Sequence, residues 1–181
     1  MSPDPPEGAR RVDEQRLDAL QRLWTPWRMA YIRDPDRKVT GCPFCVLPGG
    51  GDDREALIVH RADACFVILN AYPYNPGHLM VVPYRHVDAF DALTRDEVCE
   101  MALLSQRAVR ILAACTEAQA FNLGVNVGAV AGAGIADHIH QHVVPRWGGD
   151  TNFMPVIAGT RVLPEMLEDT YDRLAPAFAA A

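Results

Sequence analysis

The chain has 181 residues, 49% of them hydrophobic and 22% charged, which predicts one globular domain with its own core. Its 17 basic and 23 acidic residues give a formal net charge of −6. This charge argues against a nucleic-acid-binding protein, because binding to a phosphate backbone needs clustered positive charge. The chain has no run of about 18 apolar residues, so no membrane span is expected. The polar, proline-rich start of the chain does not resemble a secretory signal.

Apolar spacing and turn residues predict the elements in chain order. Residues 1–11 predict a disordered tail, and residues 12–181 are expected to form the single domain. The expected elements are a helix at 12–24, strands at 56–60, 65–70 and 78–83, a helix at 94–115, strands at 121–127 and 138–145, and a helix at 164–177. The long helix should begin at Thr94, because Glu97 completes a capping box. This order predicts an α+β fold with an antiparallel sheet.

Three histidines alternate with other residues in the last expected strand: His138, His140 and His142. Alternate side chains of a strand share a face, so the three imidazoles are expected to point the same way. They could be a chance polar face or histidines satisfied within a core. They could also bind one metal together, but the outer pair would be ~13 Å apart at the backbone, whereas zinc–nitrogen bonds are ~2.0–2.1 Å long. Different roles for the three histidines are therefore expected.

A loop of small residues leads into the histidine strand. Asn126, Gly128, Gly132 and Gly134 lie in a stretch with almost no side-chain bulk, so backbone N–H groups there can approach phosphate oxygens. Many glycine-rich loops are only turns. Beside a row of histidines, however, such a loop indicates phosphoryl chemistry, with N–H donors for the phosphate oxygens and an imidazole as the nucleophile.

Two segments resemble the hallmarks of the histidine-triad (HIT) family. The run NVGAVAGAGIADHIHQHVVPRW resembles the family signature, and NPGHLMVVPYRHV resembles its glycine–histidine strand. The resemblance extends from about Leu23 to Val162, and the flanking runs are most similar to the bacterial branch that includes diadenosine tetraphosphate phosphorylases. It implies a HIT-like fold, with a half-barrel antiparallel sheet, a long helix and a C-terminal helix. It also implies a homodimer in which each subunit carries one nucleotide site.

The resemblance also implies roles for individual residues. His140 matches the nucleophile that attacks the α-phosphorus of an adenine nucleotide, His142 matches the residue that contacts the phosphate and the leaving group, and His138 is the remaining catalytic member. The residues that match nucleotide- and phosphate-binding positions are Asn70, Asn126, Ala133, Gly134 and Gln141. The chain departs from the family pattern at four of them. Asn70 replaces the usual acidic residue on the ribose hydroxyls, Ala133 and Gly134 provide no glutamine or serine, and Gln141 replaces an apolar residue.

The cysteines predict a cytoplasmic protein with one zinc-knuckle segment. They are five in number, and three of them stand singly in apolar stretches, which is typical of thiols in a reducing compartment. The pair Cys42 and Cys45 has knuckle spacing but supplies only two of four ligands, so a redox pair and a knuckle of free thiols stay open. Some HIT proteins and the related galactose-1-phosphate uridylyltransferases carry this pair. The resemblance implies a structural zinc ion bound by Cys42, Cys45, His86 and His138.

Expectations also follow for two other histidines and two arginines. The ring of His78 is expected to bond to a backbone carbonyl near the active strand, and His60 is expected to face solvent. Because the protein is net negative, Arg146 or Arg85 should supply local attraction for an anionic substrate. The alternative for Arg146 is a surface ion pair with an acidic side chain.

The leading hypothesis is therefore an enzyme that cleaves adenine nucleotides at the α-phosphorus through a nucleotidyl-histidine intermediate. Diadenosine polyphosphates are the expected substrates, and either phosphate or water could resolve the intermediate. The alternatives are an adenosine phosphoramidase-type hydrolase, a nucleotide-binding partner protein with incidental catalysis, and a purely structural zinc module.

Overall fold

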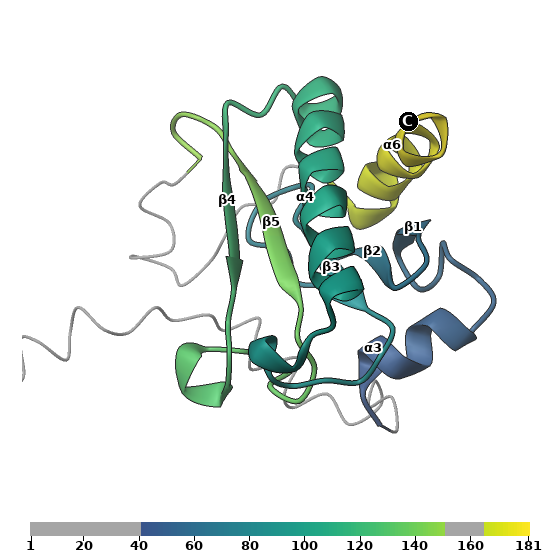
Figure 1. Cartoon of the computed structure of the whole chain (residues 1–181). Coiled ribbons are helices and arrows are strands. Elements are labelled where there is room, and N and C mark those ends of the chain that lie inside the picture. The colour runs from purple at the N-terminus through teal and green to yellow at the C-terminus, as the bar shows by residue number, and fades with distance from the viewer. Residues whose placement is uncertain (1–40, 151–164) are drawn as a thin grey trace, which may run out of the picture.

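The computed structural model describes residues 41–150 and 165–181 (Figure 1). The strands are β1 (Ile58–Arg61), β2 (Cys65–Leu69), β3 (Leu79–Pro83), β4 (Ala120–Val125) and β5 (Gln141–Arg146). The helices are α3 (Pro43–Val46), α4 (Arg95–Thr116) and α6 (Leu167–Ala180), with short 3₁₀ turns at Leu47–Gly49, Phe90–Ala92 and Ala129–Ala131. The predicted tail at 1–11, the predicted helix at 12–24 and the predicted start of the last helix at 164 lie outside the described residues.

The five strands form one antiparallel sheet in the order β1-β2-β3-β5-β4. Every residue of β2 and β3 is buried, which is why both read as continuous apolar runs rather than alternating ones. The edge strand β4 is mostly exposed. Together with the helices, this sheet confirms the predicted α+β fold.

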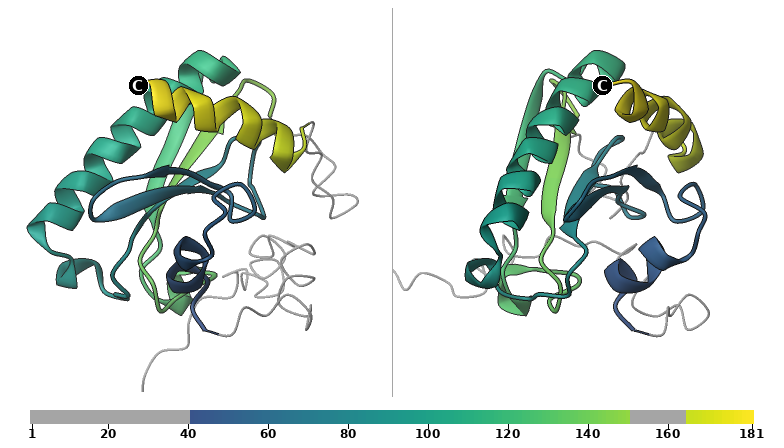
Figure 2. Two further views of the ribbon diagram at one scale, coloured as in Figure 1. Left: turned by 90° about the vertical axis from the view of Figure 1, so that its right-hand side faces the viewer. Right: turned by 45° about the vertical axis from the view of Figure 1, so that its right-hand side comes forward.

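The helices lie on opposite faces of the sheet. Figure 2 shows α4 and α6 on one side of the strands and the short helix α3 on the other. The long helix begins as predicted, because the Thr94 side chain accepts a hydrogen bond from the Glu97 N–H and the Glu97 carboxylate accepts one from the Thr94 N–H. Its buried face, including Met101, Leu104 and Ala108, packs with β2, β3, β5 and α6 into the larger core.

The expectation that His60 faces solvent is wrong. His60 is half-buried in β1, and its ring stacks on Phe178 of α6 with 5.7 Å between ring centroids. Arg107 of α4 places Nη1 3.2 Å from His60 Nε2 and also donates to the carbonyl oxygen of Phe178. Burial, and then the charge of Arg107, lower the pKa of His60. This histidine therefore helps to dock the C-terminal helix.

Within the described part of the chain, no helix has the length and apolar character needed to cross a membrane.

Candidate active site and metal centre

The row of histidines lies partly outside the strand in which it was expected. Strand β5 begins at Gln141 rather than at His138, because the Ile139 N–H donates to the carbonyl oxygen of Val87 at 2.7 Å instead of to a neighbouring strand. The alternation continues nonetheless. Ile139 is 2% exposed and belongs to the core beneath α4. The rings of His140 and His142 lie next to each other, with 4.9 Å between their centroids.

The hydrogen bond of His140 determines which of its nitrogens can react. Nδ1 lies 2.8 Å from the carbonyl oxygen of His138. A carbonyl can only accept, so Nδ1 carries the hydrogen and the neutral ring has its lone pair on Nε2. The side chain is buried, at 4% exposure. His140 is thus oriented and protonated as a nitrogen nucleophile requires.

The tautomer of His142 is set by His78, for which the sequence predicted a different hydrogen-bond partner. Nε2 of His78 lies 2.9 Å from Nδ1 of His142, so the expectation that His78 bonds to a carbonyl is wrong. The Tyr74 N–H donates to Nδ1 of His78 at 3.1 Å, which leaves the hydrogen of the neutral His78 ring on Nε2. That hydrogen is donated to His142 Nδ1, so the neutral His142 ring carries its own hydrogen on Nε2.

Asn70 lies at the start of this chain of bonds. Its Oδ1 accepts the Tyr72 N–H at 2.9 Å, and its Nδ2 lies 3.3 Å from Nδ1 of His78. The Tyr74 ring stacks on His78, with 4.7 Å between ring centroids, and encloses the fully buried histidine. The amide thus supports the same His78 tautomer from the second side, a role that the sequence analysis did not assign to it.

The expected phosphate-binding loop follows β4. Asn126 is half-buried just after this strand, and Gly128 and Gly132 adopt positive φ angles of 81° and 89°, which glycine tolerates without strain. Ala133 is half-buried and Gly134 is exposed. Ile135 packs against the apolar cluster that contains Phe44, on the face of the histidines.

Gln141 has a different position from the other expected binding residues. It lies in β5 opposite Val81 of β3 and Val125 of β4. Because it alternates with His140 and His142, its side chain projects toward the opposite face of the sheet. Its side chain is therefore not on the face that carries the His140 and His142 rings.

Neither arginine that was expected to attract substrate has an unpaired charge. Arg146 donates from Nε and Nη2 to the carboxylate of Asp150, at 2.6 and 2.9 Å, and from Nη1 to Asn122. Arg85 forms an ion pair with Glu97 at 2.7 Å. The surface ion pair considered for Arg146 is therefore present, and its acidic partner is Asp150.

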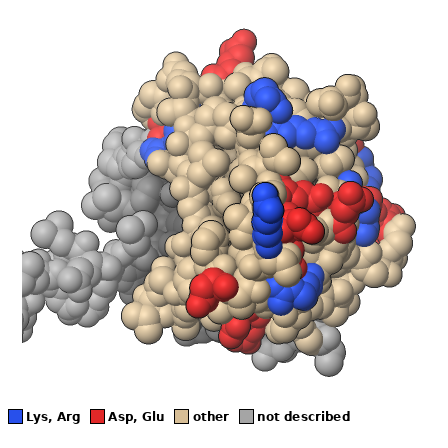
Figure 3. Space-filling model, in the orientation of Figure 1, with Lys and Arg blue, Asp and Glu red and all other residues tan. Residues whose placement is uncertain are grey.

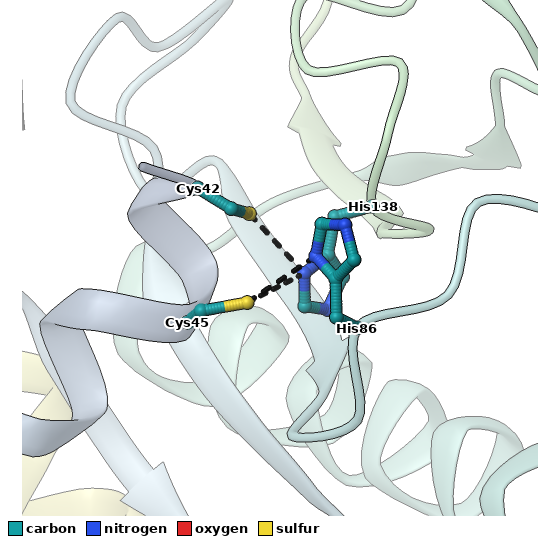
Figure 4. A group of neighbouring side chains, drawn as sticks. All are labelled: Cys42, Cys45, His86 and His138. Atoms are coloured by element: carbon teal, nitrogen blue, oxygen red, sulfur yellow. Dashed lines mark hydrogen bonds between the residues drawn. The ribbon is translucent and has the colours of Figure 1, made fainter. Parts of the chain in front are cut away.

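The four residues expected to bind zinc come together in one cluster (Figure 4). The potential ligand atoms of Cys42, Cys45, His86 and His138 all lie within 4.8 Å of one another. Nδ1 of His138 is 3.3 Å from Cys42 Sγ and 3.6 Å from Cys45 Sγ, and Nδ1 of His86 is 3.3 Å from Cys45 Sγ. Zinc–sulfur bonds of about 2.3 Å and zinc–nitrogen bonds of about 2.0 Å at tetrahedral angles require separations of roughly 3.3–3.8 Å.

The protonation of His138 suits a metal ligand. Its Nε2 lies 2.9 Å from the carbonyl oxygen of Pro83, so Nε2 carries the hydrogen and Nδ1 presents a lone pair to the two sulfurs. Burial lowers the pKa of His138 and keeps the ring neutral. The cluster therefore fits a tetrahedral metal ion with two sulfur and two nitrogen ligands.

Sequence reasoning missed Phe44 and Tyr74, whose rings contact the histidines. Phe44 lies between the two cysteines, and its ring is 5.5 Å from that of His138 and 5.1 Å from that of His140. The Tyr74 ring lies 6.0 Å from that of His142. The only signals for them were the aromatic residue inside the knuckle and the tyrosines before the glycine–histidine strand.

These features together define the class of histidine-triad proteins. They are an antiparallel sheet covered by one long helix, and a row of three histidines on the opposite face beside a cysteine knuckle. The family model for the HIT domain matches residues 52–149. The chain is also 46% identical over 169 residues to the AP-4-A phosphorylase of Mycobacterium tuberculosis, covering 90% of this chain and 86% of that protein. The chain therefore belongs to the HIT family, in the branch that includes AP-4-A phosphorylases.

Two further similarities extend the comparison. The chain is 32% identical over 99 residues to the bifunctional bis(5'-adenosyl)-triphosphatase/adenylylsulfatase of Arabidopsis thaliana, covering 55% of this chain and 53% of that protein. Among solved structures, the chain is similar to a Zn-bound histidine triad family protein from Mycobacterium smegmatis. The TM-score is 0.62 at 27% sequence identity, with 77% of this chain and 94% of that chain covered.

Proposed function

We propose that this protein is a dinucleoside polyphosphate phosphorylase that transfers a nucleotidyl group through His140. The observation that carries the proposal is the hydrogen bond from His140 Nδ1 to the carbonyl of His138, which leaves Nε2 as the nucleophilic atom. The 46% identity to a mycobacterial AP-4-A phosphorylase supports diadenosine tetraphosphate as the substrate.

In the first step, Nε2 of His140 attacks the α-phosphorus, and the bond from that phosphorus to the bridging oxygen breaks. The adenylyl group is then held on His140, and ATP departs. His142 carries a hydrogen on Nε2, so it donates to the bridging oxygen as negative charge develops there. Backbone N–H groups of the loop around Asn126, Ala133 and Gly134 stabilise the charge on the phosphate oxygens.

In the second step, inorganic phosphate attacks the same phosphorus and displaces His140, which yields ADP. Water in place of phosphate would yield AMP. Between the two steps, the hydrogen bonds of His78 and Asn70 hold His142 in the tautomer that it needs. We assign these two residues to positioning rather than to contact with ribose.

We further propose that the knuckle binds one zinc ion through Cys42, Cys45, His86 and His138. The separations among their ligand atoms and the tautomer of His138 support this set. Zinc bound by these four side chains would have a closed ligand shell, so it would stabilise the segment against the histidine row and would not activate water. The role of His138 is then to bind the metal and to orient His140 through its backbone carbonyl.

A homodimer is proposed on the basis of the edge strand β4. This strand is at the end of the sheet order and presents unpaired backbone groups. Leu123 and Val127 are 48% and 50% exposed there, and Figure 3 shows few charged side chains over the part of this face that β4 occupies. A second copy could cover this surface. None of the five cysteines, all of which lie among the described residues, forms a disulfide, which supports a cytoplasmic location.

The test is incubation with diadenosine tetraphosphate, with and without inorganic phosphate, followed by chromatographic identification of the products. Phosphate-dependent formation of ADP plus ATP is expected. If the products are AMP plus ATP, or ADP alone, whether or not phosphate is present, the reaction is hydrolysis rather than phosphorolysis. Turnover of adenosine phosphoramidate alone would favour the phosphoramidase alternative. Nucleotide binding with no turnover of either substrate would favour the alternative of a nucleotide-binding partner protein.

A further inference from the structure

The segment between the two knuckle cysteines contains an aromatic residue that has no part in binding the metal. Helix α3 spans only Pro43–Val46, and Cys42 is its N-cap residue. A helix of one turn is not stable by itself, because nucleation costs more than a few hydrogen bonds return. The position of α3 therefore depends on tertiary contacts, among them those of its two cysteines and of Phe44, which is buried at 3% exposure.

The Phe44 ring contacts both a proposed metal ligand and the proposed nucleophile. Its centroid lies 5.5 Å from that of His138 in an edge-to-face arrangement at 78°, and 5.1 Å from that of His140 at 50°. The His140 ring has a second neighbour in His142, at 4.9 Å and 78°. The imidazole of His140 is thus flanked by Phe44 and His142, while its Nδ1 is tied to the His138 carbonyl.

We propose that Phe44 is a positioning residue that couples metal binding in the knuckle to the orientation of His140. The proposal rests on the proposed roles of His140 and of the metal site. One hydrogen bond at Nδ1 still allows the imidazole to tilt about the direction of that bond. The Phe44 ring limits this tilt on one side, and the cysteines on either side hold Phe44 in place when they bind a metal.

The expected consequence concerns the rate of the chemical step rather than substrate binding. A misplacement of about 1 Å between reacting atoms is enough to cost roughly 100-fold in rate. Phe44 also belongs to an apolar cluster with Ile58, Phe66 and Ile68. A purely structural role in that cluster would lower the melting temperature without changing the orientation of His140.

The test compares Phe44→Leu with a matched control, Phe66→Leu. Phe66 is fully buried in the same cluster, and its ring packs against Tyr84 with 5.2 Å between centroids. For both variants we would measure the zinc content, the melting temperature, kcat and KM with diadenosine tetraphosphate and phosphate, and the ¹⁵N resonances of the His140 ring. If Phe44→Leu does not fold, Phe44→Met provides a second variant with a longer side chain.

The expected result for Phe44→Leu is retained zinc, a kcat about 10- to 100-fold lower, and a KM within about threefold of the wild-type value. The His140 resonances should lose the signature of a single Nδ1–H tautomer. Phe66→Leu should lower the melting temperature similarly and leave kcat and these resonances unchanged. Equal kcat in the two variants would overturn the proposal. So would an activity loss in Phe44→Leu that excess zinc restores, because Phe44 would then act only by retaining the metal.

A second arm uses a folded protein with a different metal. Replacing zinc by the larger cadmium ion in the wild type should shift the His140 resonances, and this shift should fall by at least half in Phe44→Leu. An equal shift in both proteins would mean that the effect travels through the His138 backbone, and it would contradict the role of Phe44. If instead His140→Asn retains wild-type turnover, the proposed function fails while the metal-linked shift stays interpretable.

Discussion

The two faces of the sheet are built from the same strands and both carry an apolar cluster, but the histidine face adds hydrogen bonds between ring nitrogens and their partners. In β5, Val143 is fully buried in the core beneath α4, while the neighbouring His142 forms a hydrogen bond with His78 on the other face. The helix-covered face is stabilised by apolar packing, for which size and shape matter most. On the histidine face, the partner of each ring nitrogen determines what that ring can do. Mutations of core residues beneath α4 and mutations of the histidines and their ring partners should therefore separate stability from catalysis.

The largest expected effect is on the histidine face, at the nucleophile. His140→Asn should lower kcat by at least two to three orders of magnitude, because no covalent intermediate can form. Leu104→Ala in α4 is the matched change on the other face. It should cost about 2–5 kcal/mol of unfolding free energy and leave the kcat of the folded protein nearly unchanged. A His140→Asn variant that keeps more than a tenth of wild-type turnover would remove His140 from this role.

The second effect concerns the knuckle. Cys42→Ala should abolish binding of one metal ion per chain and lower the melting temperature, because structural metal binding is coupled to folding. Elemental analysis and thermal unfolding measure the two quantities. Cys99→Ala, which changes an exposed cysteine of α4, is the control and should retain the metal. Added zinc should not raise the activity of the metal-loaded wild type, since the ligand shell is closed.

The third prediction addresses the tautomer of His142. His78→Leu removes the donor to Nδ1 of His142 and should lower kcat by roughly 10- to 100-fold, less than the roughly 100- to 10,000-fold that a positioned proton donor contributes, because His142 itself remains. His78→Gln keeps an N–H group that can donate, so it should recover part of that loss. Both values come from initial rates at saturating substrate. Equal losses in the two variants would indicate that packing of the buried ring matters rather than its hydrogen bond.

The fourth prediction concerns acid stability at the start of α4. The Arg85 guanidinium, and then the bonds with Thr94, lower the pKa of Glu97 from 4.5 to about 2. The stabilisation is therefore fully present above the unfolded-state pKa and is lost as the pH falls from about 4.5 toward 2. Glu97→Gln should reduce the unfolding free energy at pH 7 by about 1–2 kcal/mol and flatten this part of its pH dependence.

Denaturant unfolding between pH 2 and pH 7 measures this dependence. The control is Glu168→Gln, which changes an exposed residue in the first turn of α6. An acid dependence in Glu97→Gln that matches the wild type would mean that other carboxylates account for the loss.

The smallest effect is expected at Arg146. Its ion pair with Asp150 occupies the guanidinium, so Arg146→Ala should change KM by no more than about twofold at low ionic strength. A larger increase in KM that shrinks at high salt would show that Arg146 reaches the substrate. Steady-state kinetics at two salt concentrations distinguish the outcomes.

Local patterns predicted the helix-covered face well. The capping box at Thr94 and Glu97 and the apolar runs of β2 and β3 each depend on residues close in sequence. The start of β5 was misplaced because it depends on a bond between Ile139 and the distant Val87. Family resemblance, rather than spacing, brought His86 and His138 to the cysteine pair, and the structure places their ligand atoms together.

The partners of the remaining histidines could not be predicted from sequence spacing. The contact between His78 and His142 follows from the register of β3 and β5, in which Met80 lies opposite His142. A shift of one residue in that register would turn His142 toward the core. The contact of Phe44 with His140 likewise requires α3 to fold back over the histidine row. Such contacts depend on how distant segments pair, which periodicity does not encode.

The most direct test of the account is to trap the nucleotidyl enzyme. Wild-type protein would be mixed with diadenosine tetraphosphate in the absence of phosphate, quenched in alkali, in which a phosphorus–nitrogen bond to histidine survives, and digested for mass spectrometry. The account predicts an adenylyl group on His140, absent from His140→Asn and lost when phosphate is added before quenching. An adenylyl group on His142, or full turnover with no labelled peptide, would contradict it.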